Sequence, residues 1–297
     1  TYGGTSPNPP EFVSGFPVDM FIYGYKTGGD KYTADRLRGV KLLKTNSNAA
    51  ETTSDPTFDY MNGVIDGTVQ VSSIQGWMWR RASGYFDVVA YTGNGTAGRT
   101  VDHNLGVAPE MMWIKQRDGS GDWEVPCDYT NTTFRRLQLA SNGSASAVDY
   151  TSITSDSHNP LHSKPTATQI ILNSAPNVNQ NTKTYIAYLF ATLAGVSKVG
   201  SYTGNGTNQT INCGFTNGAR FVLLKRTDSL GDWTFYDSLR GIVAGNDPYL
   251  ALNNTNAESV YGATDVIDPQ SSGFIVNQGS TNNLNVNNAT YIFYAIA

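Results

Sequence analysis

Hydrophobic positions along the chain form short runs that either alternate with polar positions or are apolar throughout. Such runs lie at 86–91, 111–115, 170–172, 185–190, 221–225, 274–276 and 291–296, each bounded by Gly, Asn, Asp or Pro. This pattern is typical of half-buried and fully buried β-strands joined by turns. The best candidate for a helix is about one turn at 34–40. The pattern therefore predicts an all-β protein.

Blocks of this pattern recur in a constant order. The hexapeptide Tyr-Thr-Gly-Asn-Gly-Thr at 91–96 returns at 202–207, and the block at 113–123, which ends in Gly-Asp-Trp, returns at 223–233. Each block series closes on an apolar strand that starts at Tyr185 or at Tyr291. Three blocks repeated in one order indicate an internal duplication.

A third, degraded copy precedes these two. Residues 20–22, 29–30 and 35–40 align without a gap, at an offset of 202, with 222–224, 231–232 and 237–242. The closing strand of this copy is expected at 77–79. Its opening strand is missing or reduced to 2–5, which would fit a longer or trimmed polypeptide. The expected units are therefore 1–84, 85–196 and 197–297, each about the size of a small domain.

Within one unit the pattern predicts a β-sandwich. Two apolar strands flank a Gly-bearing loop at 118–121 and again at 228–231, which is typical of hairpins. Trp123 and Trp233 open the second strand, where each indole can bury a large area and donate its N–H to a backbone carbonyl. The closing strands are apolar on both faces and should be central. We expect tandem jelly-roll or lectin-like sandwiches, about three copies with a degenerate first, each around its own aromatic interior.

Charge and composition narrow the class of function. Charged residues make up 15% of the 297 residues, with 20 Lys+Arg against 24 Asp+Glu and a net charge of −4. Binding to nucleic acid or to an anionic membrane needs a basic stripe, and the sequence has none. No apolar run reaches the length of a membrane-spanning helix, and Thr1 is not followed by a targeting pattern. Cys127 and Cys213 are expected to be small buried residues.

Two groups of residues are candidates for metal binding. His158 and His162 are four apart with Asp156 nearby, but Pro160 lies between them, so solvated loop histidines are the favoured interpretation over a metal site. The pairs Asp118/Asp122 and Asp228/Asp232 could hold a hard cation. They lack the regular oxygen spacing of a calcium loop, and turn-forming aspartates are favoured.

The residues do not support nucleophilic catalysis or phosphate binding. The sequence contains neither a Gly-x-Ser-x-Gly elbow nor a phosphate-binding glycine loop that opens a helix. Paired carboxylates of the kind that a glycosidase needs are available on any sandwich surface, so their presence does not distinguish an enzyme from a binding protein. We therefore expect no catalytic, cofactor-binding or metal-binding residues, and no enzyme.

The long run at 79–115, which contains Tyr-Thr-Gly-Asn-Gly-Thr and ends in Met-Met-Trp-Ile-Lys, resembles a repeat family of bacteriophage virion proteins. These are tail fibres and other host-adsorption proteins, especially of phages of cyanobacteria and marine bacteria. The resemblance covers 85–297 well and 16–83 loosely. It implies a virion structural protein that binds the host surface, and it carries over no catalytic residue.

The resemblance and the composition together favour a non-enzymatic tail fibre or receptor-binding component located in the virion, on the phage tail or particle surface. Its expected partners are a host cell-surface glycan or protein receptor and other tail proteins. A homotrimer is expected, because fibres are symmetric and exposed edge strands gain by being covered. The alternatives are a capsid decoration or head-fibre protein without a ligand and, less favoured, a polysaccharide depolymerase.

Overall fold

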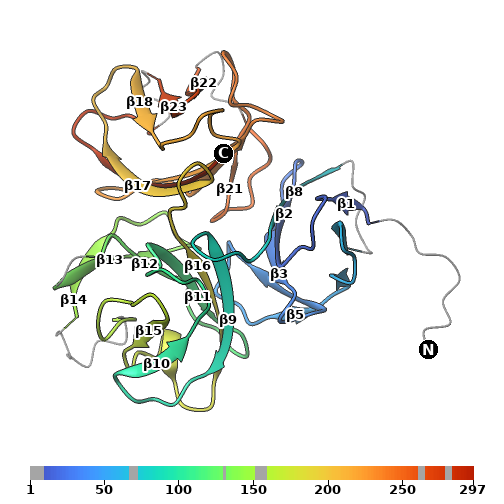
Figure 1. The fold of residues 1–297 in the computed structure, drawn as a ribbon, viewed down its shortest axis with the longest axis vertical. Coiled ribbons are helices and arrows are strands. Elements are labelled where there is room, and N and C mark those ends of the chain that lie inside the picture. The colour runs from blue at the N-terminus through green and yellow to red at the C-terminus, as the bar shows by residue number, and fades with distance from the viewer. Residues whose placement is uncertain (1–9, 67–72, 130–131, 151–158, 260–264, 278–282) are drawn as a thin grey trace, which may run out of the picture.

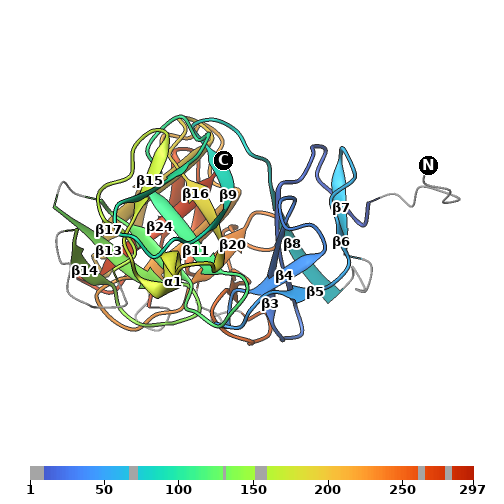
Figure 2. The ribbon, with the colours of Figure 1, turned by 90° about the horizontal axis from the view of Figure 1, so that it is seen from below.

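The computed structural model describes residues 10–66, 73–129, 132–150, 159–259, 265–277 and 283–297. Almost all regular structure is β-strand, and the predicted all-β sandwich class is confirmed. Three large antiparallel sheets, which we call the first, second and third main sheets, meet at the centre of the molecule (Figure 1). A small sheet covers the outer face of each main sheet, so that each pair forms a sandwich (Figures 1 and 2).

The first main sheet has the strand order β5-β4-β3-β2-β8, and its small sheet has the order β1-β7-β6. The strands are β1 (Phe12–Val13), β2 (Met20–Tyr25), β3 (Lys31–Asp35), β4 (Lys41–Lys44), β5 (Thr52–Thr53), β6 (Pro56–Thr57), β7 (Gly63–Asp66) and β8 (Ile74–Trp79).

The second main sheet has the order β14-β13-β12-β11-β16-β9, and its small sheet pairs β10 with β15. The elements are β9 (Phe86–Thr92), β10 (Arg99–Asp102), β11 (Met111–Gln116), β12 (Glu124–Cys127), β13 (Thr133–Gln138), β14 (Ser146–Asp149), β15 (Gln169–Leu172), the short helix α1 (Pro176–Asn179) and β16 (Thr184–Phe190).

The third main sheet has the order β17-β24-β19-β20-β21, and its small sheet has the order β18-β23-β22. The strands are β17 (Ser197–Thr203), β18 (Gln209–Asn212), β19 (Phe221–Arg226), β20 (Thr234–Asp237), β21 (Leu250–Ala251), β22 (Ile267–Gln270), β23 (Gly273–Val276) and β24 (Thr290–Ile296).

The strand predictions from periodicity are confirmed for all seven runs, and the closing strands β16 and β24 are central as expected. The helical turn expected at 34–40 is wrong, because β3 continues to Asp35 and a hydrogen-bonded turn follows. Asp35 accepts the backbone N–H of Arg38, and Gly39 ends the turn with a φ of +63°. A side chain that bonds its own backbone a few residues on stabilises a turn and not a helix.

The register of β2 also corrects the sequence alignment. Met20 lies opposite Asp35 on β3, whereas Phe221 lies opposite Asp237 on β20. Met20 is therefore equivalent to Phe221 and not to Val222, and the first hairpin is one residue shorter than the third. Successive side chains of a strand point to opposite faces of the sheet. A shift of one residue in the alignment therefore exchanges the faces to which all side chains of β2 are assigned.

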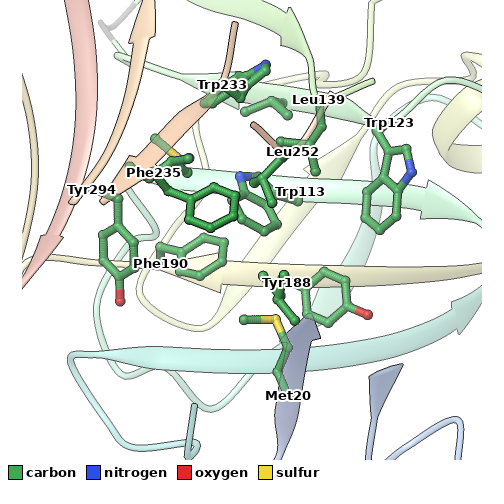
Figure 3. Packing of buried hydrophobic residues seen from close by; sticks show 14 of the residues in the cluster. Met20, Trp113, Trp123, Leu139, Tyr188, Phe190, Trp233, Phe235, Leu252 and Tyr294 are labelled. Atoms are coloured by element: carbon green, nitrogen blue, oxygen red, sulfur yellow. The ribbon is translucent and has the colours of Figure 1, made fainter. Parts of the chain in front are cut away.

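The main sheets share one interior. The expectation that each copy encloses its own aromatic core holds for the outer faces, each of which packs against its small sheet. The inner faces of all three main sheets pack together in a common core (Figure 3). Met20 comes from the first sheet, Trp113 and Phe190 from the second, and Phe235 and Tyr294 from the third. Each main sheet therefore buries apolar side chains on both of its faces.

Neighbouring sheets are joined by one hydrogen-bond pattern used three times. In each contact, the N–H of a glycine that precedes the second strand of a hairpin donates to a carbonyl in a loop of the neighbouring sheet. The residue three positions after that carbonyl donates its own backbone N–H to a carbonyl of the hairpin. The bonds are Gly121 N to Asn48 O and Glu51 N to Arg117 O, Gly231 N to Asn142 O and Ala145 N to Thr227 O, and Gly29 N to Thr255 O and Glu258 N to Lys26 O, at 2.7–2.9 Å. The second sheet thus docks on the first, the third on the second and the first on the third, which closes a ring.

The chain passes between the sheets through two equivalent turns. An isolated bridge between Ala82 and Phe86 closes the first turn, and one between Leu193 and Ser197 closes the second. The predicted boundaries near 84 and 196 fall in these turns.

Candidate functional site

A cleft with a volume of about 710 Å³ lies between the second and third main sheets. One wall is β17, the edge strand of the third sheet. The other wall is formed by the loop before β11 and the turn after β12 of the second sheet. The side chains that bear charge in this cleft are those of Glu110, Asp128, Arg135 and Lys164. A large concave site where two units meet is the usual place for a ligand.

The β17 wall offers backbone groups and small side chains. The bond from Gly204 N to Ala289 O sets the pairing with β24, so the alternate residues Ser201 and Thr203 direct their backbone groups toward the cleft. Both residues are exposed. Their N–H, C=O and hydroxyl groups form a row of neutral donors and acceptors, which matches the hydrogen-bonding needs of a sugar.

Three of the four charged side chains of the cleft, those of Glu110, Asp128 and Arg135, are in contact with protein partners. Asp128 forms an ion pair with Arg135 at 3.1 Å, and Glu110 accepts the backbone N–H of Thr192 at 2.6 Å. Tyr129 donates its hydroxyl to Pro126 O at 2.7 Å, and burial raises the pKa of this phenol well above its usual value. The cleft therefore presents the Tyr129 ring and neutral polar groups more than free charge.

The predicted candidate residues that the structure describes lie outside this cleft. His158 and Asp156 are outside the described residues. His162 is partly buried beside Gly98, and its backbone lies alongside β15, where its N–H donates to Ile171 O. In the part of the chain that the structure describes, no three His, Cys, Asp or Glu side chains are grouped as a metal would require.

The four loop aspartates accept hydrogen bonds from neighbouring side chains. Asp118 accepts from Gln116, and Asp122 accepts from Gln138 at 2.6 Å. In the third sheet, Asp228 binds the guanidinium of Arg226 through two bonds of 3.0 Å, which lowers the pKa of this carboxyl. Asp232 accepts from the amides of residues 253 and 254. These contacts support the interpretation of the four residues as turn and loop anchors.

Sequence reasoning missed three buried lysines. Lys31, Lys115 and Lys225 are fully buried, and burial lowers the pKa of each to about 8. A lysine inside an apolar strand, repeated at an offset of 110, was the signal that could have found two of them. A lowered lysine pKa is often a sign of a functional site.

Geometry gives these lysines a structural role. The Lys225 ammonium donates to four carbonyls at 2.8–3.2 Å, of which Asn142 O and Gly143 O belong to the second sheet. Lys115 reaches Asn48 O of the first sheet in the same way. Lys31 donates to Asn256 O of the third sheet. Each lysine therefore fastens one of the three contacts that close the ring.

The two tryptophans predicted to be core residues are buried beside the same contacts. Trp123 is 0% exposed and donates its indole N–H to Lys44 O at 2.9 Å, and Trp233 is 1% exposed and donates to Gln138 O at 3.0 Å. Both acceptors belong to the neighbouring sheet. The predicted burial of Cys127 and Cys213 is confirmed as well, and both thiols are free. Burial raises the pKa of the Cys213 thiol to about 12.

The fold defines an all-β protein of three main sheets closed into a ring, with a neutral cleft between two of them. A family model described as a domain of unknown function, DUF7483, matches residues 1–297, and the chain belongs to this family. Neither a curated protein nor a solved structure matches the chain. Among the described residues, no helix has the length and apolar character needed to cross a membrane.

Proposed function

We propose that this protein is a non-enzymatic structural component of a bacteriophage virion, a tail fibre or receptor-binding protein that contacts host surface glycan. The sequence resemblance supports the phage assignment. The observation that carries the binding part is the cleft of about 710 Å³ whose β17 wall offers neutral hydrogen-bond groups beside an aromatic ring. Lectin-type sites combine an aromatic platform with neutral donors and acceptors in this manner.

The side-chain environment favours binding over hydrolysis. Asp128 is exposed and paired with Arg135, and Glu110 is held by a backbone N–H, so both carboxylates of the cleft have structural partners. A general acid for glycoside cleavage is usually a carboxyl whose pKa is raised by burial. The depolymerase alternative would be favoured by release of reducing sugar from host polysaccharide.

A matched pair of variants tests the cleft. Ser201→Trp fills the cleft from β17, whereas Ala90→Trp places the same ring at the equivalent position of β9, outside the cleft. Ser201 lies opposite Ile292 and Ala90 opposite Ile186, and both are exposed. We expect Ser201→Trp to reduce binding to host cells or arrayed glycans at least tenfold and Ala90→Trp to leave it unchanged. Equal binding by both variants and the parent would exclude the cleft.

Two further experiments address assembly and location. The proposed homotrimer predicts a hydrodynamic mass of three 32.1 kDa chains at micromolar concentration, and a single-chain mass would refute it. Antibody labelling of intact particles should mark the tail or its tip. Labelling confined to the head surface, without glycan binding, would favour the decoration-protein alternative.

A further inference from the structure

The outer edge of β8 differs from the corresponding edges of the other two main sheets. β16 lies between β11 and β9, and β24 lies between β19 and β17. β8 is equivalent to these strands, because Trp77 lies opposite Ile22 as Tyr188 lies opposite Trp113. In the described part of the chain, however, β8 is bordered by β2 alone.

The backbone groups of this edge can be assigned from its pairing. Ser73 O accepts from Lys26 N, and Trp79 O accepts from Asp19 N, so the odd-numbered residues face β2. In an antiparallel strand the alternate residues then direct N–H and C=O to the other side. For β8 these are Ile74, Gly76 and Met78. Their equivalents on β16 are Tyr185, Ala187 and Leu189, which lie opposite Tyr91, Val89 and Asp87 of β9.

A groove runs along this edge. It has a volume of about 350 Å³ and lies between residues 75–79 and residues 237–239 of the third sheet. Apolar side chains are exposed at its rim, namely Val13 at 67% and Leu239 at 84%. The corresponding groove between the second and third sheets is bordered by β17. The groove beside β8 therefore lies where an added strand would pass.

The composition of the edge also favours pairing. Natural proteins protect free sheet edges with charged residues or proline. β9 and β17, the edge strands of the other sheets, carry Asp87 and Lys198, whereas the sequence of β8 is Ile-Gln-Gly-Trp-Met-Trp, without charge or proline. An unprotected edge of this kind is suited to accept an extended segment.

We propose that β8 is a docking edge for an extended strand of a partner polypeptide, which pairs antiparallel with it as β17 pairs with β24. The residues before β1 in the given sequence are poorly suited to the place: positions 7, 9 and 10 are prolines, which lack the N–H that a ladder requires, and the stretch at 2–5 is shorter than β17 and has glycine at two of its four positions, which weakens a strand. The partner strand has small or apolar side chains on alternate positions, as Val199 and Ser201 have in β17.

The test uses peptides with the sequence of β17, Ser-Lys-Val-Gly-Ser-Tyr-Thr, added to the whole chain. In β17, Gly200 and Tyr202 direct their N–H groups to β24, and Val199 and Ser201 direct theirs away. The unmodified peptide is expected to bind, N-methylation at the Gly200 position to weaken binding at least tenfold, and N-methylation at the Ser201 position to leave it unchanged. No binding, or equal effects of the two methyl groups, would overturn the proposal.

Hydrogen exchange gives a readout on the protein itself. The amides of Gly76 and Met78 should exchange rapidly in the free chain and become protected by the peptide, while the amide of Trp77 is protected in both states. Protection that appears elsewhere would overturn the assignment of the edge. So would protection of Gly76 and Met78 that rises with protein concentration in the absence of peptide, because the edge would then pair with a second copy.

Discussion

Trp233 provides the most direct test of the closed ring. Its side chain is 1% exposed, it belongs to the common core, and its indole N–H donates to Gln138 O of the neighbouring sheet at 3.0 Å. Replacement of a buried Trp by Ala typically costs about 3–5 kcal/mol, and loss of the indole hydrogen bond adds about 1 kcal/mol. We expect Trp233→Ala to lose about 4–6 kcal/mol of the free energy of unfolding.

Total stabilities of domains are typically about 5–15 kcal/mol, so the alanine variant can fall below the threshold for folding. Trp233→Phe keeps most of the apolar ring and removes the donor, and its expected loss is about 1–2 kcal/mol. The matched control is Trp123→Phe, which removes the equivalent bond to Lys44 O at 2.9 Å and should cost a similar amount.

The assay is urea unfolding followed by far-UV circular dichroism, together with amide exchange. Because the acceptor lies on β13 and the tryptophan precedes β20, protection should fall in both sheets in the Trp233 variants. A loss below about 1 kcal/mol in Trp233→Ala would refute the reasoning that the ring is core. Loss of protection confined to the third sheet would refute the claim that this residue links two sheets.

Two other substitutions test buried charge. Lys225→Met removes the ammonium that donates to the carbonyls of residues 142, 143, 226 and 231 and should cost about 2–4 kcal/mol by urea unfolding, whereas Lys198→Met on the edge strand should change stability by less than about 0.5 kcal/mol; equal effects would contradict the buried role. Burial raises the pKa of Asp247 to about 6. Between about pH 4 and 6 the folded protein therefore keeps a proton on this carboxyl that the unfolded chain has released, and the free energy of unfolding falls as pH rises through this window. Asp247→Asn keeps an acceptor for Val266 N and Ile267 N, and it should remove up to about 3 kcal/mol of this pH-dependent loss; unchanged pH dependence of the melting temperature would exclude Asp247 as its source.

The strands and their internal equivalences could be predicted because they depend on local pattern. Alternation of apolar residues, turn residues at the ends and a recurring Gly-Asp-Trp block are properties of short segments. The burial of Trp123 and Trp233 followed from the same reasoning. The sequence alignment of the first copy is wrong by one residue on β2, because the loop of its hairpin is shorter. A short apolar run does not show which of its side chains face the core.

The candidate site could not be predicted in the same way. The cleft is lined by residues from both the second and the third sheets, so no single segment carries its pattern. The histidine and aspartate candidates were chosen by spacing along the chain, and the structure places Asp118, Asp122, Asp228 and Asp232 in loop hydrogen bonds. The buried lysines show most clearly what could not be predicted from the sequence, because some of their carbonyl partners lie on another sheet.

By itself the sequence determined the class of fold, the repeated strand blocks and the aromatic residues that must be buried, because hydrophobic periodicity and turn chemistry act over a few residues. Only the tertiary structure decided that the three main sheets share one core, which contacts close the ring and which edge has no second neighbouring strand among the described residues. Such contacts join residues that are far apart in the sequence, 83 positions for Lys225 and Asn142 and 225 positions for Lys31 and Asn256, and are selected by packing of whole faces against one another.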